Sequence, residues 1–370
     1  RCFHPKRPPK LHHLRGRYRL SMPRSELSRR LAVPTAVALL MLGVPLLWIA
    51  TGHYRKFTQG QAVQEHVALA KAASSFVHEL QKERGLSAGV AASHRDPSQE
   101  AHLKDQFPIT DAAFTAYQKA ARHAFGPDQE NALAGQLGAI DAAFHRLSPF
   151  RDVVQHQAAK PLEIVGAYGQ AITPLFEAMA KLSSFIDDAE LVQHLLAYRA
   201  LMIVKDTAGI ERATGGAMIA AGQFEPDLHQ THVHAVARAA AQMSEFEAAT
   251  GPHRARYAAY AAREADSRAI EEMRRAFRDL PLTRSLESLD AGEWWAKTTA
   301  RIDRLKVLED QFADDVSRRA ADRLRTAWNG FVATIAIEFS GFAILSFLAF
   351  RYVRRTTAII AVFRRASLTP

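Results

Sequence analysis

Apolar residues recur every three or four positions along most of this chain, which is the spacing of amphipathic helices. Between residues 58 and 325, proline and glycine divide this pattern into separate segments. We expect helices at about 58–93, 98–106, 110–125, 128–147, around Pro174, and at 188–222, 226–248, 255–280 and from about Asp290 onward. No alternating segment is long enough to predict a sheet, so the predicted fold class is all-α.

Two longer apolar segments flank this helical region. Residues 31–54 contain no charged residue, and residues 326–350 contain one, Glu338. Each segment exceeds the roughly 20 residues that a helix needs to cross the hydrocarbon core of a membrane. The first is longer than a typical signal-peptide core and lacks a clear cleavage site, so we expect an uncleaved anchor. Both segments are therefore predicted transmembrane helices, and the helices that lead into them should lie near each other.

Basic residues are concentrated beside the two apolar segments. Residues 1–30 carry ten Lys and Arg against one Glu, and residues 351–370 carry five Arg and no acidic residue. The long stretch 52–325 carries 33 basic and 36 acidic residues. This distribution is the positive-inside pattern of a membrane protein, so we expect no nucleic-acid partner. The prediction is an inner-membrane protein with both termini in the cytoplasm and residues 55–325 in the periplasm.

The two ends of the chain carry further expectations. The first methionine is Met22, so we expect residues 1–21 to precede the natural start; a basic cytoplasmic tail is the alternative. We expect 351–370 to be a short basic cytoplasmic tail of a truncated gene product, because Arg364-Arg365-Ala366-Ser367-Leu368-Thr369-Pro370 resembles the lead-in to a diguanylate cyclase domain. The only cysteine is Cys2, so the exported region has no disulfide.

Two similar strings place an arginine on the apolar face of a helix. They are Leu80-Gln81-Lys82-Glu83-Arg84-Gly85-Leu86-Ser87 and, 128 residues later, Gly209-Ile210-Glu211-Arg212-Ala213. Steps of three and four residues carry the apolar stripe to Arg84 in the first helix, and through Lys205 to Arg212 in the second. Small residues beside both arginines leave room for a guanidinium and for close helix approach.

An inward guanidinium needs a negative partner, because a buried unpaired charge costs several kcal/mol. One alternative is a permanent ion pair with a carboxylate from another helix. The other is a bound planar oxyanion, such as nitrate, nitrite or a carboxylate, whose oxygens match the guanidinium donors. Glu83 and Glu211 lie about 100° round the helix from the arginines, so we expect them to bind other helices.

The strings 81–87 and 205–213 resemble two signature helices of the nitrate- and nitrite-sensing (NIT) domain family. Residues 295–303 are similar to the start of that family's last helix, and the resemblance covers roughly 58–325. It implies two stacked four-helix bundles between the two transmembrane helices, with nitrate or nitrite bound by arginines near the junction of the bundles.

The resemblance also suggests ligand-binding residues. Arg84 and Arg212 match the family's motif positions, and Lys205 matches a position that is commonly basic. Arg199 and Arg238 are further candidates by proximity alone.

Other signals point away from enzymes. We find no nucleophile elbow, phosphate loop, paired metal motif or dinucleotide fingerprint, and so expect no catalysis, metal or cofactor. His229, His232 and His234 can share a face, but nothing completes a metal site, and we expect a solvated surface. His78 is expected to pack in the helical core.

The predicted function is therefore a membrane receptor. It would sense a small oxyanion, nitrate or nitrite, in the periplasm and pass a helix shift through the unbroken segment 290–350. The predicted assembly is a homodimer, with Glu338 at the contact, that acts on a cytoplasmic signalling partner or a missing output domain. The alternatives are a helical membrane scaffold, or the truncated sensor part of a diguanylate cyclase or other signalling enzyme.

Overall fold

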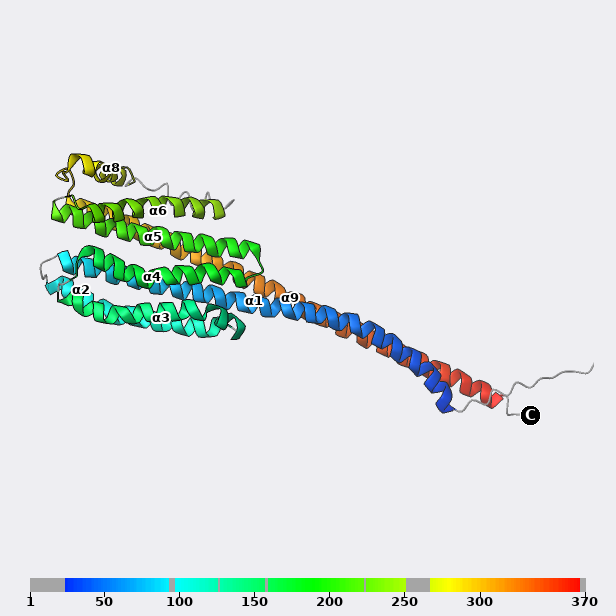
Figure 1. The fold of residues 1–370 in the computed structure, drawn as a ribbon. Coiled ribbons are helices and arrows are strands. Elements are labelled where there is room, and N and C mark those ends of the chain that lie inside the picture. Colours follow the sequence, from blue (N-terminus) through cyan, green and yellow to red (C-terminus); the bar gives the residue numbers. More distant parts are fainter. Residues whose placement is uncertain are drawn as a thin grey trace, which may run out of the picture. The chain divides into compact units, whose positions relative to one another are not determined.

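The computed structural model describes residues 24–92, 97–125, 127–156, 159–222, 224–250 and 267–366. Every regular element among these residues is a helix, which confirms the all-α class. The chain divides into two compact units. One is Lys56–Trp328, and the other comprises the segments before and after it (Figure 1). The expectations for residues 1–21 and for the last four residues lie outside the described residues.

Most predicted helices are confirmed within a few residues, but the helix expected at 128–147 continues through Pro149 to Gln155. The first and last helices extend through the apolar segments without a break. The helices are α1 (Arg24–Ala92), α2 (Pro97–Ala124), α3 (Pro127–Gln155), α4 (Pro161–Leu182), the short turn η1 (Ser183–Phe185), α5 (Ala189–Ala221), α6 (Pro226–Thr250), α8 (Ser267–Thr283) and α9 (Ala291–Ala366). The first part of the helix predicted at 255–280 lies outside the described residues.

The prediction of two short helices at 98–106 and 110–125 is wrong. Helix α2 continues through Pro108, which costs a backbone hydrogen bond and about 3 kcal/mol. Buried residues stand on both sides of that proline, including Leu103, Phe114 and Tyr117. Burying side chains of this size contributes about 1.5–3 kcal/mol each, which offsets the proline.

Side-chain caps set the ends of the helices that carry the site. At the start of α5, the carboxylate of Asp188 accepts a hydrogen bond from the backbone N–H of Leu191. The helix ends at Gly222, whose φ of 63° favours glycine. The carboxylate of Asp290 accepts a hydrogen bond of 2.7 Å from the backbone N–H of Glu293 at the start of α9. These caps fix where both helices begin.

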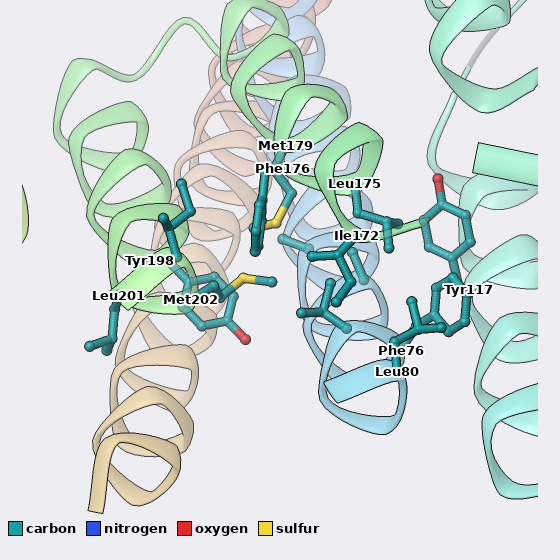
Figure 2. Close-up of a cluster of buried hydrophobic side chains, with 14 of the residues drawn as sticks. Phe76, Leu80, Tyr117, Ile172, Leu175, Phe176, Met179, Tyr198, Leu201 and Met202 are labelled. Atoms are coloured by element: carbon teal, nitrogen blue, oxygen red, sulfur yellow. The ribbon is translucent and has the colours of Figure 1, made fainter. Parts of the chain in front are cut away.

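One large apolar core connects α1 to α6 and α9. Figure 2 shows Phe176 and Met179 of α4 facing Tyr198 and Met202 of α5. Phe76 of α1 packs in the same core, where its ring contacts aromatic rings of α2 and α3. A smaller cluster joins the end of α5 to α6, α8 and the start of α9. The first cluster is continuous, so α5 is packed on both sides.

Helices α1 and α9 lie side by side, as predicted (Figure 1). Within the unit Lys56–Trp328, Lys71 forms an ion pair of 3.0 Å with Asp314. The rings of Phe57 and Trp328 are 5.0 Å apart in the same unit. In the other unit, the rings of Tyr54 and Phe331 are 6.0 Å apart.

One helix in the described part of the chain is long and apolar enough to cross a membrane. It is α9, over Ala291–Ile359. The same criterion does not identify the segment predicted at 31–54, several of whose side chains lie outside the described residues.

Candidate functional site

The two repeated glutamates each bind an arginine of another helix, as expected. Glu83 of α1 is fully buried, and Arg151 of α3 donates to it through Nε at 2.8 Å and Nη2 at 2.9 Å. The hydroxyl of Tyr168 in α4 donates a third hydrogen bond of 2.7 Å. Glu83 is therefore neutralised by α3 and does not neutralise its neighbour Arg84.

Glu211 of α5 repeats this arrangement. Arg274 of α8 donates to both of its oxygens, at 2.7 and 2.8 Å, and Arg301 of α9 adds a bond of 3.0 Å. Burial alone would raise the pKa of the Glu211 carboxyl, but the hydrogen bonds from Arg274 and the charge of Arg301 lower it below its usual value. Glu211 is thus a charged anchor for α8 and α9.

Arg84 lies in the core between α1 and α5, and only 2% of it is exposed. Its Nη2 lies 3.0 Å from a carboxylate oxygen of Asp206 and 3.1 Å from the backbone oxygen of that residue. Gln81 donates to the same carboxylate at 3.2 Å. Nη1 of Arg84 has no hydrogen-bond partner among the described residues. The guanidinium therefore has one side held and one side available.

Arg212 is partly buried and forms no ion pair in the described part of the chain. Its Nη1 donates a hydrogen bond of 2.9 Å to the hydroxyl of Thr299, and its guanidinium carbon lies 4.4 Å from the centre of the Trp295 ring. Burial, followed by the positive charge of Arg84, lowers the pKa of Arg212 to about 10. The charge of Arg84 therefore acts on Arg212 across the contact between α1 and α5.

Each arginine points at a glycine on the opposite helix. A Cβ at Gly209 of α5 would lie 2.7 Å from Nη2 of Arg84. A Cβ at Gly85 of α1 would lie 3.0 Å from Nη2 of Arg212. The two repeated strings therefore cross, and each supplies the space for the other's guanidinium. The structure brings Arg84 and Arg212 together, as the sequence predicts.

Lys205 is fully buried but has a protein partner. Its ammonium lies 2.7 Å from a carboxylate oxygen of Glu309 in α9, and the hydroxyl of Ser74 in α1 donates to the same carboxylate. Burial lowers the pKa of Lys205, while Glu309 acts in the opposite direction. Contact between Lys205 and a ligand stays a prediction, because its charge is already compensated.

The other candidate residues lie elsewhere. Nε of Arg199 donates to the backbone oxygen of Phe176 at 2.8 Å, and Arg238 is exposed on α6, so proximity in sequence was a poor guide. His78 is partly buried, and burial, followed by the charge of Lys205, lowers its pKa to about 4.

The histidine cluster is only in part the solvated face that we expect from the sequence, because His234 is exposed and His232 is not. His232 is buried, and its ring centre lies 4.4 Å from that of Phe277. Burial lowers its pKa to about 4. No group of three or more His, Cys, Asp or Glu that could hold a metal occurs among the described residues.

Sequence reasoning missed three neighbours of the arginine pair. Asp206 directly follows Lys205 in the second string, and Trp295 and Thr299 lie in the third string. All three lie within the motif strings 205–213 and 295–303, which was the signal that could have identified them. Nothing in the sequence indicated which arginine each would contact, because the contacts cross between distant helices.

Comparisons with known proteins show the fold and the family of this chain. A solved structure titled "Structure of the NasR transcription antiterminator" matches with a TM-score of 0.65 and 23% identity, over 84% of each chain, which shows a similar fold. The "Nitrate regulatory protein" of Klebsiella oxytoca is 26% identical over 281 residues, which are 75% of this chain and 68% of that protein. The family model described as nitrate and nitrite sensing (NIT) matches residues 75–317, well over half of the chain. This chain therefore belongs to the nitrate- and nitrite-sensing family.

Proposed function

We propose that this chain is a membrane receptor that binds nitrate or nitrite between Arg84 and Arg212. The observation that carries the proposal is the crossed arrangement of the two guanidiniums, one with an unpartnered Nη1 and the other without an ion pair among the described residues. A planar oxyanion offers acceptors that match two such forks of donors.

The charges around the pair support a monovalent anion. Among the described residues, Asp206 is the carboxylate within ion-pair distance of either guanidinium, and Asp303 acts on Arg212 from a greater distance. The cluster keeps a positive charge in a largely desolvated place, which is costly unless an anion compensates it. One nitrate or nitrite would balance that charge.

The grouping of the helices supports an arrangement with the site at a junction. We propose that α1–α4 form one four-helix bundle and that α5, α6, α8 and α9 form the other. Glu83 ties α1 to α3 and α4, whereas Glu211 ties α5 to α8 and α9. The arginines beside these glutamates reach from one group to a glycine of the other.

A signal would pass from the site through α9. An anion between the guanidiniums removes their repulsion and lets α1 and α5 approach, which biases a helix shift. A nearly complete switch requires about 10⁴-fold preference for one state, or roughly 5.5 kcal/mol. Two hydrogen bonds to charged groups, at roughly 1.5–3 kcal/mol each, are close to that amount.

Exposed apolar side chains support the membrane location. Leu40, Met41 and Trp48 of α1 are 68%, 73% and 79% exposed, and Ile337 and Phe339 of α9 are 72% and 75% exposed. Apolar side chains gathered on two neighbouring helices indicate a lipid or protein environment. We propose two spans, both termini in the cytoplasm and the unit Lys56–Trp328 in the periplasm.

The same proposal covers assembly and output. Oε1 of Glu338 has no hydrogen-bond partner within the described residues, which supports a contact with a second copy in a homodimer. We propose no catalytic activity for these residues and a cytoplasmic signalling partner as the output.

Calorimetric titration of the chain in detergent with sodium nitrate and sodium nitrite tests the binding proposal. Nitrate should release or absorb heat in a saturable way, and Arg212→Gln and Arg84→Gln should each weaken binding by about tenfold or more. Arg146→Gln is the matched control, because it removes the same charge from an exposed position on α3. Equal affinity in all four proteins would refute this site.

Cysteine labelling tests the topology. In a Cys2→Ser background, Thr115→Cys and Arg354→Cys place single thiols at exposed positions of α2 and α9. A membrane-impermeant maleimide should label Thr115→Cys in cells with a permeabilised outer membrane, and label Arg354→Cys only after lysis. Equal labelling of both in unlysed cells would contradict a two-span receptor.

A membrane scaffold with permanent ion pairs is the second candidate. The Arg84–Asp206 pair at 3.0 Å favours it. Under that function, Asp206→Asn would leave Arg84 uncompensated and destabilise the fold whether nitrate is present or not. Under the receptor function, nitrate would restore part of that loss. Denaturant titrations of Asp206→Asn with nitrate or chloride separate the two.

A further inference from the structure

The first three turns of α9 hold the second repeated string from several sides. The indole Nε1 of Trp294 donates to the backbone oxygen of Arg212 at 3.0 Å. Its ring fills the space beside Gly215, where a Cβ would lie 2.5 Å from it. Two turns further on, Arg301 binds Glu211. The start of α9 is therefore fixed against α5 at the level of Arg212.

This docking places Thr299 against the guanidinium of Arg212. Thr299 lies four residues after Trp295, so both side chains occupy one face of α9. The Trp295 ring covers the flat side of the guanidinium, and the Thr299 hydroxyl accepts a hydrogen bond of 2.9 Å from its edge. Stacking and edge contact together fix the plane in which the donors of Arg212 lie.

The hydroxyl of Thr299 differs from those of other α9 threonines. They donate back to backbone oxygens of their own helix, as Thr298, Thr326, Thr334, Thr356 and Thr357 do. Thr299 instead accepts from Arg212 and donates no hydrogen bond within the described part of the chain. A hydroxyl has one proton to donate, so this proton is available at the donor edge of a cation.

We propose that Thr299 is a third ligand-contacting side chain of the anion site, and that through it α9 binds the oxyanion directly. This inference rests on the proposed function of the Arg84–Arg212 pair. An anion in the fork of Arg212 accepts the proton of the Thr299 hydroxyl while that oxygen keeps its bond from Nη1. The helix that leads toward the membrane is then part of the binding site.

The test compares valine, which has the shape of threonine without its hydroxyl, with serine, which keeps the hydroxyl. The full chain in detergent is titrated with sodium nitrate at constant ionic strength, balanced with sodium chloride. Thr299→Val should weaken nitrate binding about tenfold or more, because a hydrogen bond to a charged group is lost. Thr299→Ser should bind close to wild type. Thr298→Val is the matched control, because its hydroxyl bonds Trp294 within α9.

A measurement on the unaltered chain keeps the inference testable if Thr299→Val folds poorly. Amide hydrogen exchange over 291–302 should slow when nitrate is added and stay unchanged with chloride. Unchanged exchange, or a Thr299→Val variant that binds nitrate as well as the wild type, would overturn the role of Thr299. If Arg212→Gln still loses nitrate binding in that case, the proposed arginine site stands without Thr299. If the wild-type chain binds neither nitrate nor nitrite, both proposals fail.

Discussion

The ammonium nitrogen of Lys205 lies 2.7 Å from a carboxylate oxygen of Glu309, and neither side chain is exposed to solvent. This pair joins α5 to α9 inside the core, two turns before Arg212 in the same helix. Because water cannot compensate either charge, each side chain depends on the other.

Lys205→Met should therefore destabilise the fold strongly. It leaves the Glu309 carboxylate buried without its cation, which typically costs about 3–5 kcal/mol of unfolding free energy. Lys205→Met with Glu309→Leu removes both charges and should recover most of that loss. Denaturant titration of the chain in detergent, followed by circular dichroism, measures both. A double variant as unstable as the sum of the single variants would contradict a coupled pair.

Gly209→Ala should reduce anion binding more than stability. A Cβ there would lie 2.7 Å from Nη2 of Arg84 and would displace the guanidinium, whereas alanine favours the helix itself. We expect nitrate affinity to fall about tenfold, with little change in the unfolding midpoint. Gly166→Ala is the control, because no atom lies within 4 Å of its added Cβ. Calorimetric titration with nitrate compares Gly209→Ala with Gly166→Ala. Equal nitrate affinity in both variants would contradict the close approach of α1 and α5 at Arg84.

Glu83→Gln should destabilise the chain by about 3 kcal/mol, because Arg151 loses a carboxylate that accepts from two of its nitrogens. Glu211→Gln should have a similar effect, since Arg274 and Arg301 share that carboxylate. The exposed Glu177 provides the control, and Glu177→Gln should change the unfolding free energy by less than about 0.5 kcal/mol. Wild-type stability in both buried variants would show that these pairs contribute nothing.

The stability of the fold should decrease as the pH falls from about 6.5 toward 4. Burial lowers the pKa of His232 to about 4 in the folded chain, compared with the usual histidine value of 6.5. Between these values the unfolded chain binds the extra proton, so acid favours unfolding by up to roughly 3 kcal/mol. His78 acts in the same direction. The lowered pKa of Glu211 acts below 4.5 instead.

Substitution of His232 checks the source of this pH dependence. His232→Gln cannot titrate, so its unfolding midpoint should change less between pH 7 and pH 4.5 than that of the wild type. Replacement of His234, which is exposed on α6, should leave the wild-type slope intact. If the unfolding midpoint of His232→Gln changes with pH as much as that of the wild type, the pH dependence belongs to other groups.

The sequence predicted the part of this arrangement that depends on helix geometry. Steps of three and four residues placed Arg84 and Arg212 on packed faces, and the angle between neighbours directed Glu83 and Glu211 toward other helices. The structure confirms both. These predictions succeeded because each concerns one helix, whose regular rotation relates sequence position to direction.

Predictions failed where packing between distant segments decides the outcome. Nothing in the sequence pairs Lys205 with Glu309, or Arg151 with Glu83, since each pair joins helices far apart in the chain. His232 was expected in solvent, but α8 and α9 cover it with Phe277 and Trp294. Pro108 suggested a break that the packing of α2 overrides.

Arg84 needs the space beside Gly209, and Arg212 needs the space beside Gly85. These two contacts constrain how such sequences can change. A larger residue at either glycine would obstruct the arginine of the other helix, not the arginine of its own helix. Among related proteins, the residue at position 84 should therefore covary in side-chain volume with the residue at position 209, and the residue at 212 with the residue at 85.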